Sequence, residues 1–186
     1  MKRLVTDSFF RGVLHSSRLL PAMITGVFLV YGSGQDAELT LREIRASDIL
    51  EIVQLQKDSG AVLVNFWATW CRPCVEEFPM IINLSENYPS SDLTIYLVSV
   101  DWLDEKEKVV TFLTNHGISG LSFIKNQGDD EFINAIWKEW TGAIPFNIVY
   151  GKETGNVIDF WEGKQPVTRF ERAIGNALDN QHGGSS

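Results

Sequence analysis

The chain has 186 residues, of which 44% are hydrophobic, enough for one domain with a hydrophobic core and a short appendage. Its formal net charge is −8, and without residues 1–33 it keeps 12 Lys and Arg against 23 Asp and Glu, a net charge of −11. This acidity argues against nucleic acid and anionic membrane surfaces as partners, because both would repel the domain.

The first 33 residues have the layout of an export signal. Four basic residues precede or flank an apolar stretch at 19–31, and the small residues Gly32-Ser33-Gly34 follow it, as near a cleavage site. The stretch is shorter than the roughly 20 residues that a transmembrane helix needs, and no cysteine follows it that could carry a lipid. We therefore expect a signal peptide at 1–33, with an uncleaved N-terminal membrane anchor as the alternative, and a periplasmic or otherwise extracytoplasmic domain at 34–180.

Strand-like and helix-like segments alternate through this domain, which predicts an α/β fold. The expected strands are 39–44, 61–70, 93–100, 121–124, 146–150 and 157–161. The expected helices are 48–57, 72–87, 104–115, 129–140 and 166–178. Ser47 is the expected cap of the first helix, Pro79 should kink the second, and the tail at 181–186 is expected to be disordered.

The two cysteines of the chain, Cys71 and Cys74, stand where the second strand passes into the second helix. Free N–H groups and the positive end of the helix dipole favour a thiolate at Cys71, and Cys-X-X-Cys motifs have thiol pKa values lowered to roughly 3.5–7.5. Cys71 is thus the candidate nucleophile, and Cys74 is the candidate resolving thiol. Arg72 adds a positive charge nearby, and Pro73 suits the first helical turn because its missing N–H costs little there.

Two other interpretations of the cysteine pair are open. Half of a four-ligand zinc site would need further Cys or His nearby, whereas the histidines, at 15, 116 and 182, are distant in sequence. A purely structural disulfide would close a loop of two residues and would restrain the unfolded chain very little. We favour redox chemistry, for which no metal or cofactor is expected.

The segment Trp-Ala-Thr-Trp-Cys-Arg-Pro-Cys at 67–74, followed by Glu77-Phe78-Pro79, resembles the active site of thioredoxin-fold proteins. It is most similar to the TlpA, ResA and DsbE-like branch of the thiol:disulfide oxidoreductases, and the likeness extends more loosely from 37 to 180. The resemblance implies a thioredoxin-like three-layer α/β/α sandwich with a central mixed sheet, an N-terminal β extension and an inserted segment at 118–141.

The resemblance also implies a substrate face opposite the cysteines. Such proteins carry a cis-proline where this chain has Ile144-Pro145 before an apolar strand, and a cis bond there would expose the Ile144 backbone for strand-like pairing with an extended substrate. An ordinary trans proline opening the strand is the alternative. Gly163 would lie beside this proline and permit close approach of a substrate chain. The expected substrate-binding residues are Trp70, Arg72, Pro73, Ile144, Pro145 and Gly163.

One position departs from thioredoxins proper, which keep a buried acid six residues before the first cysteine. This chain has Asn65 there, which cannot titrate. Glu77 follows Cys74 by three residues, on the same helix face, and the resemblance places a functional glutamate at this position. Burial would raise its pKa and suit it to acid/base work on Cys74. A surface charge that favours the helix dipole is the alternative.

The tryptophans other than Trp70 are expected to be packing residues rather than ligand contacts, because large aromatic side chains usually build the core. They are Trp67, Trp102, Trp137, Trp140 and Trp161.

The function implied is an extracytoplasmic dithiol:disulfide oxidoreductase. Cys-X-Pro-Cys resembles reducing thioredoxins, so the expected direction is reduction of protein disulfides. Members of the branch often reduce apocytochrome c before haem attachment and are recharged by a membrane thiol donor. The implied partners are therefore disulfide-containing proteins, apocytochrome c among them, and such a donor, with no nucleic acid and membrane contact only through an N-terminal anchor. The alternative is a peptide-binding or chaperone module that retains the thioredoxin fold.

Overall fold

The computed structural model describes residues 38–179. The export segment expected at 1–33 and the tail expected at 181–186 lie outside the described residues. The chain divides into two units, 1–35 and 36–186, and the second unit is the one with described structure. Among residues 38–179, every helix is too short or too polar to cross a membrane.

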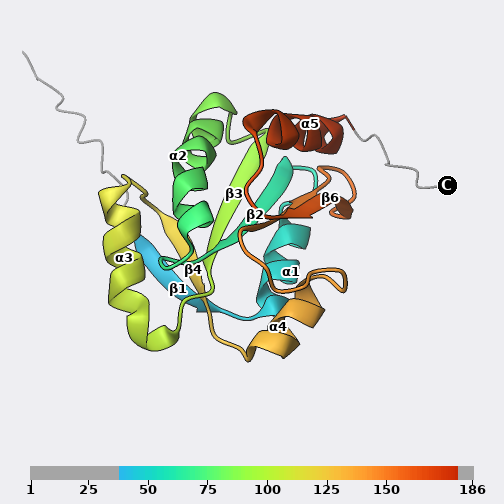
Figure 1. The fold of residues 1–186 in the computed structure, drawn as a ribbon. Helices are drawn as coiled ribbons and strands as arrows, with labels where there is room; N and C mark the ends of the chain where they lie inside the picture. The colour runs from blue at the N-terminus through green and yellow to red at the C-terminus, as the bar shows by residue number, and fades with distance from the viewer. Residues whose placement is uncertain (1–37, 180–186) are drawn as a thin grey trace, which may run out of the picture. The chain divides into compact units, whose positions relative to one another are not determined.

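A six-stranded mixed sheet forms the centre of the unit (Figure 1). Its strands are β1 (Thr40–Ile44), β2 (Ala61–Trp67), β3 (Leu93–Ser99), β4 (Leu121–Lys125), β5 (Phe146–Tyr150) and β6 (Val157–Glu162). They lie in the order β1-β4-β3-β2-β5-β6. The first four in this order pair in parallel, whereas β5 runs antiparallel to both β2 and β6. Strand β2 is buried along its whole length, as expected for an apolar strand covered on both faces.

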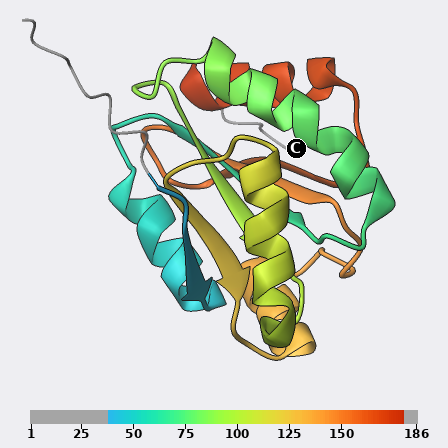
Figure 2. The same cartoon turned by 90° about the vertical axis from the view of Figure 1, so that its left-hand side faces the viewer.

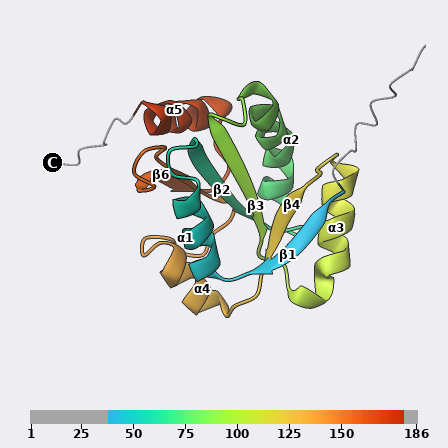
Figure 3. The same cartoon turned by 180° about the vertical axis from the view of Figure 1, so that it is seen from behind.

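Helices cover both faces of the sheet. They are α1 (Ala46–Leu55), α2 (Arg72–Asn87), α3 (Lys106–Asn115), α4 (Asp129–Ile136) and α5 (Val167–Leu178), with a 3-10 turn η1 (Leu103–Glu105) before α3. Figure 1 shows α2, α3 and α5 on the near face, and Figure 3 shows α1 and α4 from the other side. Figure 2 shows the sheet between α1 and the pair α2 and α3. The predicted three-layer α/β/α sandwich is therefore confirmed.

The sheet separates two hydrophobic cores, because neighbouring residues of β2 point to opposite faces. Trp67 packs under α2 and α3, with ring centroids 4.9 Å from both Phe78 and Phe112. Phe66 lies on the other face, where its ring centroid is 4.9 Å from that of Trp140. The cysteine-bearing junction therefore begins at a strand end that is fixed from both sides.

Beyond β3, the sheet continues with β4 and then β1. Strand β1 forms this edge of the sheet and pairs in parallel with β4, with Thr40 opposite Leu121. Strand β4 and α4 come from the segment at 118–141, and β4 joins β1 to β3 in the sheet. The N-terminal β extension is therefore present, and it is attached through the predicted inserted segment.

Several predicted helix boundaries are wrong. Helix α1 ends at Leu55 rather than at 57, and α3 begins at Lys106 rather than at 104, because residues 103–105 form the turn η1. Helix α1 begins at Ala46 rather than Asp48, and its N-cap is Arg45 rather than Ser47, because the Asp48 carboxylate accepts the Arg45 backbone N–H at 3.0 Å from inside the first turn. Helix α4 ends at Ile136 rather than Trp140.

The early end of α4 places an aromatic ring in the core. Trp137 adopts an extended backbone, with φ −157° and ψ 126°. The chain then turns so that the Trp140 ring stacks on Phe146, with centroids 4.5 Å apart, and its indole N–H donates to the Ala143 carbonyl at 2.9 Å. Tertiary packing thus overrides a helical pattern in the sequence.

Candidate active site

The two cysteines form a disulfide at the start of α2, with an S–S distance of 2.05 Å. Cys71 is the N-cap of the helix, and its Sγ accepts the Cys74 backbone N–H at 3.3 Å. Both cysteines are buried, with 5% of Cys71 and 2% of Cys74 exposed. The nucleophile predicted from the sequence thus receives a helix N–H at its sulfur, the arrangement that favours a thiolate.

A buried carboxylate fastens the loop before Cys71. Asp101 accepts the Thr69 backbone N–H at 2.9 Å and the Thr69 hydroxyl at 2.5 Å, and the Ser99 hydroxyl donates to it at 2.7 Å. Asp101 was not predicted from the sequence. Asp101 follows the carboxyl end of β3, and Ser99 pairs with Trp67 at the end of β2. The contact between Asp101 and Thr69 could have been predicted from the sequence, because the carboxyl ends of neighbouring parallel strands lie side by side.

The Ile144–Pro145 peptide bond is cis, as predicted. The carbonyl oxygen of Ile144 lies 3.6 Å from Cys71 Sγ. Gly163 lies on the other side of the proline, where its backbone N–H donates to the Pro145 carbonyl at 2.8 Å. Gly163 has a positive φ of 77°, and a Cβ there would meet no atom within 4 Å, so the space next to the proline is open. Ile144, Pro145 and Gly163 therefore lie together beside the first cysteine.

Glu77 is buried, with 1% of the residue exposed, so the interpretation as a surface charge is wrong. Its carboxylate accepts the Gln165 backbone N–H at 3.1 Å and the Asn147 side-chain N–H at 3.3 Å. Burial raises the pKa of Glu77, while these two hydrogen bonds and the charge of Lys164 act in the opposite direction. A titratable carboxyl thus lies one helical turn beyond Cys74, as predicted.

A second buried amide, missed by our sequence analysis, connects Glu77 to Asn65. Asn65 and Asn147 face each other across β2 and β5, and Asn65 Nδ2 donates to Asn147 Oδ1 at 2.8 Å. Both side chains are buried. Asn147 is the one polar amide in the apolar strand after the cis-proline. A polar residue in a strand buried on both faces needs a buried partner, and this need could have indicated the contact from the sequence.

Arg72 and Pro73 lie on the exposed side of the first turn of α2. Arg72 pairs with Glu76 at 3.0 Å, and Lys164 pairs with the same carboxylate at 3.1 Å. These cations lower the pKa of Glu76, with Lys164 the stronger influence. The positive charge of Arg72 is therefore shared with an exposed carboxylate rather than directed only at the sulfurs.

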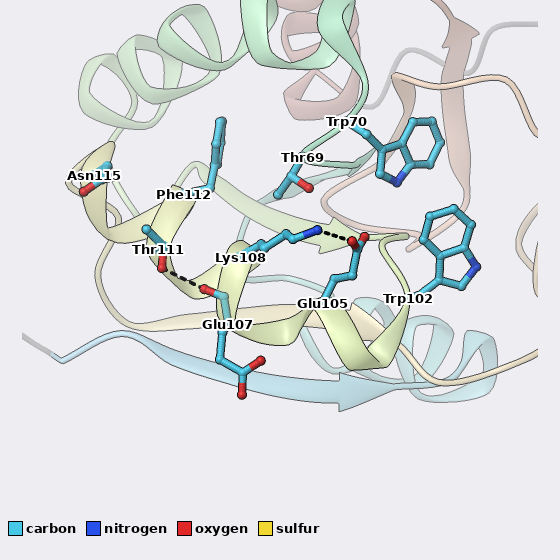
Figure 4. A pocket seen from close by; sticks show the side chains of 9 residues that line it. All are labelled: Thr69, Trp70, Trp102, Glu105, Glu107, Lys108, Thr111, Phe112 and Asn115. Atoms are coloured by element: carbon cyan, nitrogen blue, oxygen red, sulfur yellow. Dashed lines mark hydrogen bonds and ion pairs between the residues drawn. The ribbon is translucent and has the colours of Figure 1, made fainter.

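The prediction for Trp102 is wrong, because its side chain is exposed rather than packed in the core. Trp102 is 64% exposed and Trp70 is 55% exposed, with ring centroids 6.1 Å apart. Figure 4 shows the two rings side by side at one end of a cleft of about 880 Å³ that runs along α3. A smaller, mostly apolar hollow of about 260 Å³ includes both rings and Ile144. Trp67, Trp140 and Trp161 are buried, as expected.

The fold is thioredoxin-like, and the Cys-X-X-Cys stands at the start of a helix. Residues 51–139 match the Thioredoxin family. A thiol-disulfide isomerase from Corynebacterium glutamicum has the same fold, with a TM-score of 0.56 at 14% identity over 67% of this chain and 84% of that chain.

Several relatives in sequence are named thiol-disulfide oxidoreductases or interchange proteins. Thiol-disulfide oxidoreductase ResA of Bacillus subtilis is 34% identical over 86 residues, which are 46% of this chain and 46% of that protein. The thiol:disulfide interchange protein DsbE homolog of Paracoccus denitrificans is 36% identical over 64 residues, which are 34% of this chain and 32% of that protein. The chain thus spans less than half the length of these relatives.

Proposed function

We propose that this protein is an extracytoplasmic dithiol:disulfide oxidoreductase that reduces disulfides in protein substrates. The observation that carries the proposal is the position of Cys71 Sγ, which receives a helix N–H at 3.3 Å and lies 3.6 Å from the carbonyl before the cis-proline. The nucleophile and the backbone that would hold a substrate are thus adjacent. The named functions of the relatives support the same reaction class.

The reaction consists of two thiol–disulfide exchanges. The Cys71 thiolate attacks one sulfur of the substrate disulfide, forms a mixed disulfide and releases the other substrate sulfur as a thiolate, which takes up a proton. Cys74 then loses its proton, attacks Cys71 Sγ and releases the second substrate thiolate. Two electrons pass to the substrate, and the Cys71–Cys74 disulfide remains. A dithiol donor must reduce it before the next cycle.

Glu77 is the proposed acceptor for the Cys74 proton. It is buried one helical turn beyond Cys74, and the aligned thioredoxin position is the non-titrating Asn65. Burial raises the pKa of Glu77, which brings a carboxyl closer to the pKa of the thiol that it deprotonates.

The substrate is proposed to bind as an extended chain along Ile144 and Pro145. A cis-proline exposes the preceding backbone for strand-like pairing, and Gly163 leaves the space beside it open. Trp70 and the small hollow that it shares with Trp102 offer an apolar contact for a side chain near the substrate cysteine. Arg72 and Pro73 are proposed to border this surface on the solvent side.

The proposed location and partners of the protein are supported by its sequence and by its relatives. The basic and apolar residues at 1–33 support export, either as a cleaved signal peptide or as an anchor. Apocytochrome c is the proposed substrate and a membrane thiol carrier the proposed donor. We infer the first from the similarity to a DsbE homolog and the second from the need for a reductant in each cycle.

Reduction of insulin by dithiothreitol tests the activity. The wild-type domain should accelerate the precipitation of reduced insulin chains, and Cys71→Ser should lose this acceleration, because no mixed disulfide can form at residue 71. Equal activity in the two proteins would contradict the enzymatic proposal. If the domain instead slowed aggregation to the same extent with and without Cys71, the peptide-binding or chaperone function would be favoured.

A further inference from the structure

A continuous row of buried hydrogen bonds links Asn65, Asn147 and Glu77 beneath the cysteines. Asn65 Nδ2 donates to Asn147 Oδ1 at 2.8 Å, and Asn147 Nδ2 donates to Glu77 Oε2 at 3.3 Å. All three residues are buried, with at most 2% of each exposed. Buried amides need partners for both ends, so each member of the row constrains the orientation of the next.

The direction of this row follows from the chemistry of its ends. An ionised carboxylate only accepts hydrogen bonds, so Asn147 must present its NH₂ group to Glu77. Its oxygen then faces β2, where it needs a donor. Asn65 supplies that donor, which an ionised aspartate at the same position would lack. The amide at residue 65 therefore supports the orientation of Asn147 that favours an ionised Glu77.

We propose that Asn147, oriented by Asn65, is a positioning residue that holds the Glu77 carboxylate in place and keeps it ready to accept the Cys74 proton. This inference rests on the proposed role of Glu77 in the reaction. Asn147 donates its side-chain N–H to Glu77, so it acts on the thiol chemistry through that carboxylate.

Asn147 differs from the other groups around Glu77 in its position and its burial. From the loop before α5, the Gln165 N–H binds the other carboxylate oxygen at 3.1 Å, and Lys164 contributes positive charge while it pairs with Glu76. On α2 itself, the titratable neighbours in sequence are Cys74 and Glu76. Asn147 is the donor from the sheet side, and it is fully buried, so water cannot replace its N–H without entering the core.

Titration of Glu77 in the oxidised protein tests the proposal without interference from the thiols, since disulfide-bonded cysteines do not titrate. Glutamate labelled with ¹³C at the carboxyl allows each pKa to be followed by NMR, and the signal missing from Glu77→Gln identifies Glu77. In Asn147→Leu, which has a similar volume, the pKa of Glu77 should rise by about one pH unit or more, because a hydrogen bond to a charged group is lost. The pKa of Glu76 should stay unchanged.

Two further variants provide a second test and a control. Asn65→Asp should also raise the pKa of Glu77, because an ionised carboxylate at residue 65 would draw the Asn147 NH₂ group to itself and add negative charge nearby. This near-isosteric change keeps the test available if Asn147→Leu does not fold. Ser122→Ala removes a buried polar group of β4 outside the row and should leave the Glu77 titration unchanged.

An unchanged pKa of Glu77 in folded Asn147→Leu or Asn65→Asp would overturn the proposal and make the amide pair purely structural. The outcome is independent of the proposed function, because the titration needs no substrate. In the reduced protein, the same variants should move the pH profile of thiol alkylation in parallel with the Glu77 titration. A profile that stayed in place while the Glu77 pKa moved would instead contradict the role of Glu77 as proton acceptor.

Discussion

At the scale of single residues, the site combines one buried acid with two amides where thioredoxins proper use a buried acid on the strand. Glu77 extends from α2 toward β5 and meets Asn147, while Asn65 occupies the strand position. A carboxyl on the helix lies on the same face as Cys74 and moves with it. The titrating group is thus carried by the element that also carries both sulfurs.

Burial of Glu77 predicts a pH-dependent loss of stability. Its folded-state pKa is raised above the ordinary value of 4.5, so well below pH 4.5 the carboxyl is protonated in both the folded and the unfolded chain. As the pH rises toward the folded-state pKa, the unfolded chain ionises first and the free energy of unfolding falls, at no more than about 1.4 kcal/mol per pH unit.

Glu77→Gln removes this titration. We expect the stability of the wild type relative to Glu77→Gln to decrease as the pH rises from 4.5 and to level off above the folded-state pKa. Urea unfolding of both oxidised proteins between pH 4 and 8 measures the difference. If the stability of the wild type relative to Glu77→Gln stayed constant or increased as the pH rises, burial would not raise the pKa of this carboxyl.

At the scale of elements, the ends of β2 and β3 and the start of α2 form one unit around Asp101. The carboxylate ties Thr69 to the end of β3 through Ser99, and Trp70 and Cys71 follow directly. The loop is therefore attached to the sheet two residues before the nucleophile, which limits how far the sulfur can move during exchange.

Asp101→Ala should lower the free energy of unfolding by about 2–4 kcal/mol, because it leaves the half-buried donors of Thr69 and the buried hydroxyl of Ser99 without a partner. Chemical denaturation of the oxidised proteins measures this loss. Asp104→Ala, three residues later on the exposed turn η1, is the matched control and should change stability by no more than about 0.5 kcal/mol. Equal effects of the two substitutions would show that the Asp101 contacts do not hold the loop.

The elements also show which features could be predicted from the sequence. The bounds of α2 and the position of the cis-proline follow from local patterns, because caps, prolines and apolar runs act within a few residues. Asn147 and Asp101 were missed because their partners lie on neighbouring strands, and pairing depends on sheet register. Trp102 was assigned to the core because large aromatic side chains usually pack there, whereas it lies in the loop between β3 and η1 and is exposed.

At the scale of the whole molecule, the sheet order places the reactive groups together. Strand β2 lies between β3 and β5, so its carboxyl end meets Asp101 from one side and the cis-proline from the other. Helix α2 begins at the same point and supplies both cysteines and Glu77. The acidic, thioredoxin-like domain at 34–180 is proposed to act outside the cytoplasm, with residues 1–33 as the segment that takes it there.

The central claim is that Cys71 is the nucleophile that exchanges with substrate disulfides. Incubation of reduced Cys74→Ser with a disulfide-containing peptide, followed by mass spectrometry of the non-reduced digest, tests it most directly. We predict a stable mixed disulfide on Cys71, because the thiol that would resolve it is absent, and little adduct on Cys74 in the Cys71→Ser protein. No adduct on Cys71, or faster adduct formation on Cys74, would contradict the proposed mechanism.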